Sequence, residues 1–593
     1  MKEIIKERLK VLRSLMSQKG ISAYLINGSD PHLGEYLPSR WETRTFISGF
    51  TGSYGWLAIT LDEAVLWTDS RYYLQYEIET EGTGISLEKA RLPETIPVEV
   101  WVSQRLKAGE KVGFDGSCYP ASEVNRYIKF FSKKGIRTES HFDLLDEIWP
   151  ERPGLPFAKA FLHPVEWAGL SRKEKFKIIH EETLKQNSDI TIISALDDLC
   201  WTFNIRGNDV DFNPLVLGYG IISKGNAILF IDKNKFDNSS LKELKEDGVE
   251  ILPYDQFYTY ISTIEGERIL IDPDRTNYLI EMVLRERNHI SEAVSLPNLL
   301  KSRKNNAEIE GFKKANITDG VALLDFVYWI ENNIGKTTIT EWDAVCKLDE
   351  FRSKRPGYRG SAFYPIIGYK DHGAIVHLHV SKEFASKLEP EGVLLFDSGG
   401  QYDFGTIDTT RTIALGPVDD DVRRDFTLAL KGVIALSTAS FPKGTIGCHL
   451  DVLVRNYLWR NKMNYGHGTS HGVGSFLNVH EGPMSIRQDL NNQPICPGNV
   501  ISVEPGIYRT GKYGVRTENV LVCVEDEESE FGQFLKFETL TVFPIDTHLI
   551  DKYLLSDQEI IWINTYHEEV YSKLSPLVSA EKLDLLKRLT QAI

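Results

Sequence analysis

The sequence predicts a multidomain α/β protein, and three observations support this prediction. Its 593 residues exceed what one hydrophobic core usually serves, so about two to four domains are expected. Strand-like and helical segments alternate in the first half of the chain, which is typical of α/β layers. The last third instead carries short apolar runs that end in glycine-rich turns, typical of strands with tight connections.

Two stretches predict domain boundaries. The first is the proline-rich segment 149–156, and the second lies near residues 296–306. We interpret the basic run 301–304 in the second stretch as a solvated linker. A long amphipathic helix should follow it, with these residues on its apolar side: Ile309, Phe312, Val321, Leu324 and Val327. The predicted domains are therefore 1–150, 151–304 and 305–593, the last with a C-terminal extension.

Both ends of the chain predict helices. Residues 1–20 are charged and amphipathic, unlike a signal sequence, with an apolar side made of Ile4, Leu9, Leu12 and Leu15. The region after about residue 547 has apolar residues at helical spacing, typical of a helix packed on its own domain: Trp562, Ile563, Tyr566, Val570 and Tyr571. No apolar run approaches the roughly 20 residues that span a bilayer, so we expect a soluble cytoplasmic protein without membrane contact.

Composition excludes some classes of partner. The net charge is −16 and no basic stripe is present, which argues against nucleic acid. The six cysteines lie far apart without a CxxC pair, in a chain large enough not to need disulfides. We expect reduced thiols.

Five residues in the last third predict a metal site: Asp397, Asp408, His471, Glu504 and Glu518. Asp397 ends the apolar run 393–396, where a carboxylate is costly unless a partner neutralises it. The pattern of residues 397–408 suggests strand, turn and strand, so Asp408 should return beside Asp397 across a hairpin. Two carboxylates would then face one point.

The other three residues occur in similar settings. His471 lies in the glycine-rich loop 466–472, Glu504 lies between an apolar run and Pro505-Gly506, and Glu518 lies in the strand-like stretch 513–524. Each residue alone is more simply explained as a turn cap or an ordinary loop residue. The ordered set, with separations of 11, 63, 33 and 14 residues, is what indicates a site. Acids and histidine without cysteine suit manganese, cobalt or zinc, and two ions would need bridging carboxylates.

The sequences of these segments resemble those of the pita-bread metallopeptidases, a family that includes methionine aminopeptidase, prolidase and aminopeptidase P. They are most similar to those of the long three-domain form of aminopeptidase P (Xaa-Pro aminopeptidase). The matching segments near the site are 396–402 (FDSGGQY), 408–412 (DTTRT), 467–483 (HGTSHGVGSFLNVHEGP), 504–506 (EPG) and 515–519 (VRTEN). Residues 44–55 (RTFISGFTGSYG), 67–72 (WTDSRY) and 195–214 resemble segments of the N-terminal domains. The resemblance thus covers nearly the whole chain.

The resemblance implies a fold and an activity. The fold is two creatinase-like N-terminal α/β domains followed by a C-terminal pita-bread domain. The activity is metal-dependent removal of the N-terminal residue from peptides with proline in second position, through a hydroxide that a dinuclear metal centre activates. A prolidase-type Xaa-Pro dipeptidase and a non-catalytic peptide-binding module stay open as alternatives. The C-terminal region of the long form takes part in dimerisation, so a homodimer is also implied.

The resemblance also implies roles for the ligands. Asp397 would hold one of two divalent ions, Asp408 and Glu518 would bridge both, and His471 with Glu504 would complete the second. Mn²⁺ is the expected ion, with Co²⁺ or Zn²⁺ as alternatives. Glu504 would also carry a proton from water to the leaving proline nitrogen.

Further residues match positions that contact the substrate in this family. His480 and His377 would act in catalysis as well as in substrate binding, and His467 would bind substrate. His480 is the candidate donor to the scissile carbonyl oxygen, and His377 lies in the apolar, strand-like run 374–378. Arg516 would contact the ligand residues rather than the metal and so support them. Glu35 would reach the substrate's α-amine. Ser502, next but one to Glu504, departs from the long animal form, which has an acid beside the ligand.

Overall fold

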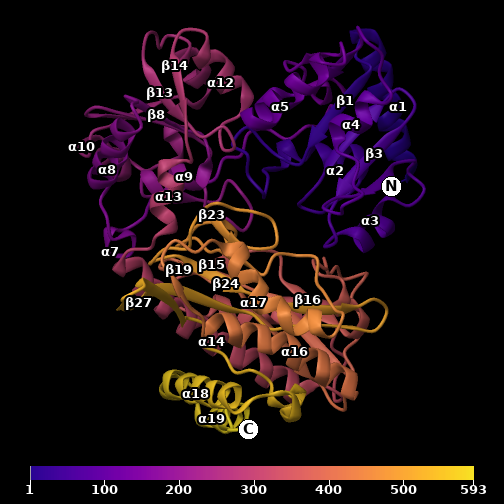
Figure 1. Cartoon of the computed structure of the whole chain (residues 1–593), viewed down its shortest axis with the longest axis vertical. Coiled ribbons are helices and arrows are strands. Elements are labelled where there is room, and N and C mark those ends of the chain that lie inside the picture. Colours follow the sequence, from indigo (N-terminus) through magenta and orange to yellow (C-terminus); the bar gives the residue numbers. More distant parts are fainter. Residues whose placement is uncertain (1) are drawn as a thin grey trace. The chain divides into compact units, whose positions relative to one another are not determined.

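The computed structural model describes residues 2–593, which form two compact units (Figure 1). One unit comprises Met1–His163 and Leu170–Asn298, and the other comprises Pro164–Gly169 and Leu299–Ile593. Within the described residues, no helix combines the length and the apolar composition that crossing a bilayer requires.

The first unit contains two six-stranded mixed sheets. The order of the first sheet is β4-β3-β2-β1-β5-β6, with strands β1 (Ala23–Asn27), β2 (Trp56–Thr60), β3 (Ala64–Thr68), β4 (Ser86–Lys89), β5 (Lys111–Gly113) and β6 (Arg137–Glu139). Its helices are α1 (Lys2–Lys19), α2 (Thr43–Ser48), α3 (Tyr73–Thr80), α4 (Val98–Ser103), α5 (Ala121–Ser132) and α6 (Leu144–Ile148). Alternate residues of β1 join different apolar clusters, Tyr24 and Ile26 with α1, Ala23 and Leu25 with α5. Apolar side chains therefore cover both faces of this sheet.

The second sheet repeats the arrangement of the first. Its order is β12-β11-β10-β8-β13-β14, with strands β8 (Ile190–Ile193), β10 (Tyr219–Ser223), β11 (Asn226–Phe230), β12 (Val249–Leu252), β13 (Arg268–Ile271) and β14 (His289–Glu292). The central strand of each sheet has an antiparallel neighbour on one side and a parallel neighbour on the other. The main helices that accompany the second sheet are α8 (Arg172–Lys185), α9 (Leu196–Thr202), α10 (Asn238–Glu246), α11 (Phe257–Ile261) and α12 (Tyr278–Arg285).

Helix α1 confirms the predicted N-terminal helix but corrects its buried face. Ile5 is fully buried, whereas Ile4 is 51% exposed. The buried residues are Ile5, Leu9, Leu12, Leu15 and Met16. The spacing from Leu9 back to Ile5 is one helical turn, so Ile5 continues the apolar stripe and Ile4 does not.

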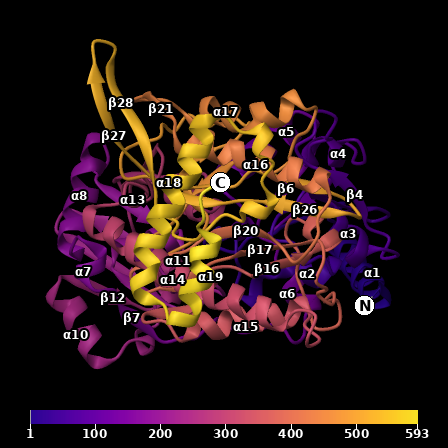
Figure 2. The ribbon, with the colours of Figure 1, turned by 90° about the horizontal axis from the view of Figure 1, so that it is seen from below.

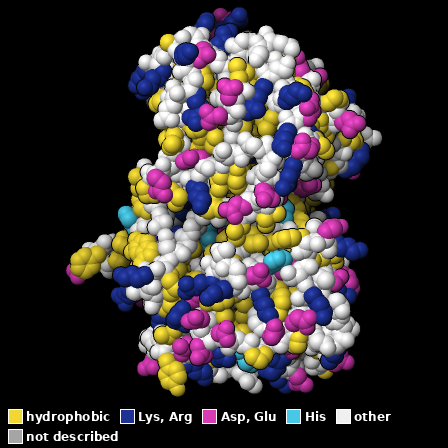
Figure 3. Space-filling model, turned by 90° about the vertical axis from the view of Figure 1, so that its right-hand side faces the viewer, with side chains coloured by type: hydrophobic (Ala, Val, Ile, Leu, Met, Phe, Trp, Pro, Cys, Tyr) yellow, Lys and Arg dark blue, Asp and Glu magenta, His cyan; other side chains and the backbone are white. Residues whose placement is uncertain are grey.

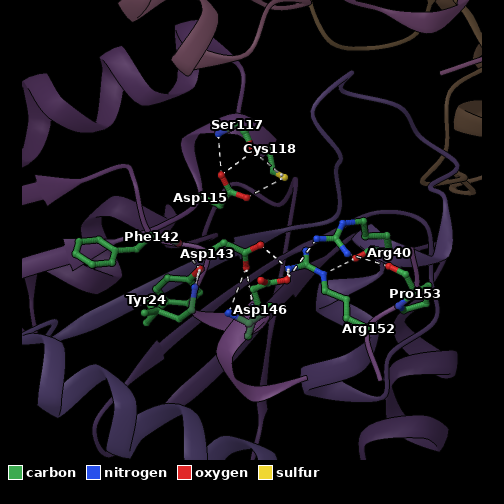
Figure 4. A network of polar contacts seen from close by, with 12 residues as sticks. Tyr24, Arg40, Asp115, Ser117, Cys118, Phe142, Asp143, Asp146, Arg152 and Pro153 are labelled. Atoms are coloured by element: carbon green, nitrogen blue, oxygen red, sulfur yellow. Dashed lines mark hydrogen bonds and ion pairs between the residues drawn. The ribbon is translucent and has the colours of Figure 1, made fainter. Parts of the chain in front are cut away.

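A polar network binds the proline-rich stretch after α6 to the first sheet domain (Figure 4). Arg152 donates to the carboxylates of Asp143 and Asp146 and, through Nε, to the Arg40 carbonyl at 3.0 Å. Arg40 donates in return to the Pro153 carbonyl at 2.9 Å. These reciprocal bonds hold the stretch in a defined conformation.

The chain passes from the first unit into the long segment of the second within a helix that the sequence did not predict. Residues Leu296–Ser302 form α13, and the side chains of Lys301 and Lys304 are 1% and 0% exposed. Both contact the carboxylate of Glu481. The interpretation of the basic run as a solvated linker is therefore wrong, because a buried partner draws these lysines inward.

The predicted long helix follows directly. Helix α14 (Asn306–Asn333) begins with a capping box between Asn305 and Glu308. It buries Phe312, Val321, Leu324 and Val327 as expected, and Ile309 is partly buried. The unit's other α-helices in the described residues are α7 (Val165–Ala168), α15 (Glu341–Ser353), α16 (Asp420–Ser437), α17 (Gly447–Arg460), α18 (Asp557–Leu574) and α19 (Ala580–Leu589).

The strands of this unit form several small sheets and one large sheet. One small sheet contains β15 (Tyr358–Ser361), β18 (Gly400–Tyr402) and β19 (Gly405–Thr406). A second contains β16 (Ile366–Tyr369), β17 (Val393–Ser398) and β20 (Thr409–Ala414). A third is the pair β25 (Gly506–Arg509) and β26 (Tyr513–Arg516). The large sheet has the order β21-β28-β27-β24-β22-β23, with β21 (Ser440–Pro442), β22 (Ser470–Gly472), β23 (Glu481–Ile486), β24 (Val500–Val503), β27 (Asn519–Ser529) and β28 (Gly532–Thr539). Figure 2 shows the end of the β27–β28 hairpin projecting from the unit.

The C-terminal helices pack on their own unit, as the sequence predicted. Helix α18 contacts α14 and α16, and it buries Ile563, Tyr566 and Val570. On the face of the molecule drawn in Figure 3, basic and acidic side chains are interspersed, with no continuous basic patch.

Candidate metal centre

Strands β17 and β20 bring Asp397 and Asp408 toward each other. The strands are antiparallel, with Asp397 opposite Thr410, and Asp408 immediately precedes β20. The predicted single hairpin is wrong in one respect, because β18 and β19 form a second hairpin between these strands and belong to a different sheet. Gly399, between β17 and β18, lets the backbone pass close to Ile407, since a Cβ at residue 399 would lie 1.7 Å from the Ile407 carbonyl oxygen.

Asp408, His471 and Glu518 form a cluster with metal-ligand geometry. Their nearest ligand atoms all lie within 4.8 Å of one another. His471 Nε2 lies 3.3 Å from Asp408 Oδ2 and 3.7 Å from Glu504 Oε1, so Glu504 faces the same point. Nδ1 of His471 lies 2.9 Å from the Gly472 carbonyl oxygen, a contact that fixes Nε2 as the atom that faces the acids.

Backbone contacts hold these side chains in place. The N–H of Glu504 donates to the Thr469 carbonyl at 2.9 Å, and the N–H of His471 donates to the Ser502 hydroxyl at 3.1 Å. Ser502, the position that departs from the long animal form, thus supports a ligand candidate directly.

Glu518 lies in a connection between two strands rather than inside one. The stretch 513–524 divides into β26 and β27, and Glu518 falls between them. Its N–H donates to the Thr410 carbonyl at 3.1 Å, and the Thr410 hydroxyl donates to Glu518 Oε2 at 2.8 Å. Glu518 Oε1 and Asp397 Oδ1 are buried and accept no hydrogen bond from any residue in the described range 2–593.

Burial and mutual repulsion shift the protonation of these acids. Burial raises the pKa of Glu504 to about 7; His471 and Arg516 oppose this shift, and Asp408 and Asp397 add to it. Burial and the other three carboxylates raise the pKa of Glu518 well above its ordinary value. Burial lowers the pKa of His471, but its hydrogen bond to Asp408 and the nearby acids outweigh that effect and raise it to about 9.

These features fit divalent cations. Together with Asp397 and Glu504, the cluster offers four carboxylates and one imidazole. Two of the buried oxygens accept no hydrogen bond within residues 2–593, and the raised pKa values mean that a cation would displace protons on binding. Hard oxygen ligands with one nitrogen are typical of catalytic metal sites without cysteine.

Arg516 and Tyr508 connect the acids to His467. Arg516 donates to Asp397 Oδ2 at 2.6 Å and to the Tyr508 hydroxyl at 2.8 Å. The Tyr508 hydroxyl in turn lies 2.7 Å from His467 Nε2. Burial raises the pKa of Tyr508 to about 12, although Arg516 opposes the shift, so the phenol stays protonated. Tyr508 was not predicted from the sequence, and the available signal was its place in the short hairpin after Glu504-Pro505-Gly506.

The other predicted residues lie in three different settings. The ring of His480 lies against that of His471, with centroids 4.5 Å apart at 80°. His377 follows the 3₁₀ helix Lys370–Ala374 in a turn, so the predicted strand over 374–378 is wrong. Glu35 belongs to the first unit, where the Ser53 hydroxyl donates to it at 3.4 Å. The substrate-binding roles of these residues stay predictions.

Family models cover nearly the whole chain. Residues 8–147 and 151–308 each match the creatinase/prolidase N-terminal domain. Residues 310–525 match metallopeptidase family M24, and residues 533–593 match the C-terminal region of peptidase M24.

Curated relatives and a solved structure match over the full length. The chain is 37% identical over 612 aligned residues to a probable Xaa-Pro aminopeptidase P of Paracoccidioides lutzii, covering 99% of each chain. It is 36% identical to a protein of the same name from Sordaria macrospora, covering 97% of each. The solved X-prolyl aminopeptidase of Caenorhabditis elegans, described as a cytosolic enzyme with a di-nuclear active site, aligns with TM-score 0.95 and 32% identity over 99% of this chain and 100% of that one.

A prolidase-type structure matches less of the chain. The Xaa-Pro dipeptidase of Bacillus anthracis covers 63% of this chain and 99% of its own, with TM-score 0.51 and 22% identity, a likeness of fold alone. The extent and identity of the full-length matches decide the family. The chain belongs to metallopeptidase family M24 and carries creatinase/prolidase N-terminal domains ahead of its metallopeptidase domain.

Proposed function

We propose that this protein is an Xaa-Pro aminopeptidase, which removes the N-terminal residue from peptides with proline in second position. The observation that carries this proposal is the full-length match to the C. elegans X-prolyl aminopeptidase, together with the converging carboxylates and imidazole of the cluster. The smaller coverage of the dipeptidase disfavours the prolidase alternative.

The proposed ligands of two divalent ions are Asp397, Asp408, His471, Glu504 and Glu518. We propose Mn²⁺ as the native ion, with Co²⁺ or Zn²⁺ as alternatives, because the donor set is mostly oxygen. When bound, the ion pair supplies Lewis acidity that lowers the pKa of water and polarises the scissile carbonyl.

Glu504 is the proposed proton carrier. Its carboxylate lies 3.7 Å from His471 Nε2, which places it where it could accept a proton from water at the proposed centre. It would return that proton to the proline nitrogen, because an amide anion is a poor leaving group.

His480 and His377 are proposed to hold the substrate during this step. His480 packs on His471, so its ring lies beside the cluster and can donate to the carbonyl oxygen as negative charge develops there. His467, which Tyr508 orients, and Glu35 are proposed as further substrate contacts. Arg516 is proposed to support the ligands by holding Asp397.

Three broader features complete the proposal. The domains are residues 1–150, 151–304 and 305–593. The location is the cytoplasm, which agrees with the description of the C. elegans enzyme as cytosolic. The assembly is a homodimer, for which the exposed apolar side chains Val452, Leu453 and Trp459 on α17 offer a surface; sedimentation analysis tests it.

The experiment that tests the activity uses chelator-stripped protein. Release of the first residue from an Xaa-Pro-Yaa tripeptide is measured with and without added Mn²⁺. Hydrolysis only with metal supports the proposal. Cleavage of an Xaa-Pro dipeptide but not the tripeptide would identify a prolidase, and no cleavage of either with Mn²⁺, Co²⁺ or Zn²⁺ would favour a peptide-binding module.

A further inference from the structure

Arg411 is a buried cation next to the metal cluster, and it pairs with no carboxylate of residues 2–593. Its side chain is 1% exposed, and it lies on β20, three residues after Asp408. Its guanidinium donates only to neutral oxygens, those of the carbonyls of Thr410, Glu518, Phe543 and Pro544, the Asn519 side chain and the Tyr566 hydroxyl. Hydrogen bonds to neutral acceptors, rather than an ion pair, therefore hold this side chain.

One side of this guanidinium contacts the backbone of the metal site. Nη1 donates to the carbonyl oxygens of Glu518 and Thr410. Thr410 also hydrogen-bonds Glu518 through its carbonyl and its hydroxyl. Arg411 thus closes a set of bonds that fixes the backbone and one carboxylate oxygen of Glu518 relative to β20.

The other side contacts the C-terminal region. Nη2 donates to the hydroxyl of Tyr566 at 2.9 Å, and that hydroxyl donates to the Phe543 carbonyl at 2.8 Å. Tyr566 lies on α18, is 5% exposed and stacks on Trp562 with ring centroids 5.3 Å apart. Nε donates to the Pro544 carbonyl at 2.9 Å, so residues beyond the M24 match of 310–525 supply several of the acceptors.

We propose that Tyr566 and Arg411 are positioning residues of the metal centre, through which the C-terminal region holds Glu518 in place. The C-terminal region thereby contributes to metal affinity as well as to packing. The inference rests on the metal site proposed above but not on the identity of the substrate.

The physical reason is the absence of any carboxylate partner for Arg411. A guanidinium held by neutral acceptors has no strong charge pair that would keep it in place when one acceptor is lost. Without the Tyr566 hydroxyl, Nη2 keeps only the Asn519 side chain and the Phe543 carbonyl as acceptors, so the guanidinium can shift toward these two. The Glu518 carbonyl would then lose its fixed partner. Outer partners of metal ligands typically change metal affinity by about 10–100-fold, and Tyr566 lies one contact farther out, so we expect a smaller effect.

The test compares Tyr566→Phe with Tyr571→Phe by calorimetric titration of Mn²⁺ into chelator-stripped protein. Both changes remove one hydroxyl from α18, but Tyr571 makes none of the contacts to Arg411. We expect Y566F to weaken Mn²⁺ binding about 3- to 10-fold, below the range for direct partners of ligands, and Y571F to leave it unchanged. With saturating Mn²⁺, kcat and KM of Y566F for an Xaa-Pro tripeptide should return to wild-type values.

Arg411→Lys provides the second variant. It keeps the charge and loses the fork, so its Mn²⁺ affinity should fall more than that of Y566F. Unchanged Mn²⁺ affinity in Y566F, even with a lower Tm of the metal-free protein, would overturn the proposal, because a merely structural role moves only the Tm. A wild-type protein that binds no Mn²⁺ would overturn the metal site and this inference together. Metal binding without tripeptide hydrolysis would contradict only the proposed function.

Discussion

Arg516 donates from Nη2 to Oδ2 of Asp397 across 2.6 Å, and both side chains are buried. The same guanidinium donates through Nε to the Thr410 hydroxyl at 3.1 Å. Since Asp397 Oδ2 is engaged, Oδ1 is the oxygen left to face a cation. The pair therefore favours Oδ1 as the oxygen that would bind an ion in the proposed site, and the arginine charge opposes the rise in the Asp397 pKa that burial causes.

Replacing Arg516 with Gln should weaken metal binding. Burial already raises the pKa of Asp397, and loss of the arginine charge would raise it further, so a cation must displace a more tightly held proton. We expect Mn²⁺ affinity to fall about 10- to 100-fold, as for other direct partners of ligands. Calorimetric titration measures it. Arg509→Gln, on the same hairpin but bonded to Asp425, is the control, and equal affinities in the two variants would contradict the assignment.

Replacing Asp408 with Asn should abolish peptide hydrolysis and lower the number of Mn²⁺ ions bound per chain. An amide carries no charge and cannot bridge two cations as a carboxylate does. Metal content by mass spectrometry and tripeptide cleavage measure the two effects. Asp403→Asn is the matched control, because Asp403 lies near the same turn and pairs with Arg359. Full activity in D408N would remove Asp408 from the ligand set.

The metal-free protein should lose stability as pH rises from about 5 to 9. Glu504 has a folded pKa of about 7 against an ordinary value of 4.5, so between these values the folded state holds a proton that the unfolded state releases. His471, with a folded pKa of about 9 against 6.5, contributes stability that is lost as pH rises through this second window. Both groups act in the same direction.

Bound Mn²⁺ should oppose this loss, because metal ligands bind in their deprotonated forms. The difference in Tm between loaded and chelator-stripped protein should therefore grow from pH 5 to pH 8. Thermal scans at a series of pH values measure it. A difference that stays constant or shrinks as pH rises would show that these groups do not bind the metal.

Replacing Gly399 with Ala should distort the β17–β20 connection. The added Cβ would lie 1.7 Å from the Ile407 carbonyl oxygen, far inside van der Waals contact, so the backbone before Asp408 must move. We expect a lower Tm and loss of metal binding together. Gly154→Ala, whose added Cβ meets nothing within 4 Å, should leave both unchanged. Wild-type metal binding in G399A would mean that the turn is not required for the site.

Replacing Lys304 with Met should destabilise the second unit. Lys304 and Lys301 share the buried carboxylate of Glu481. Loss of the sole partner of a buried charge typically costs about 3–5 kcal/mol, and because Lys301 stays beside Glu481 we expect a loss below this range. Lys313→Met removes an exposed pair with Glu310 on α14, where a loss of about 0–1 kcal/mol is typical. Urea unfolding of both variants gives the comparison. Similar losses would show that burial of Lys304 adds no stability.

Local patterns predicted several elements correctly. The apolar period of α14, and the helical spacing of Ile563, Tyr566 and Val570 in α18, depend on neighbours within a few turns. The strand that ends at Asp397 was visible because its apolar run is continuous. The errors also have local causes. The apolar stripe of α1 could have continued through Ile4 or through its neighbour Ile5, and the sequence pattern did not distinguish them. The apolar run around His377 is compatible with a buried turn as well as with a strand.

The sequence by itself determined the family motifs, the residue types at the candidate metal centre and the helices whose period is local. Only the tertiary structure decided that Arg516 contacts Asp397, that Tyr508 contacts His467 and that Glu481 buries Lys304. These contacts join residues on different strands and helices, so strand register and helix packing select the partners. A charged residue in the chain has the same local pattern whether it meets solvent or a buried partner, and folding decides between them.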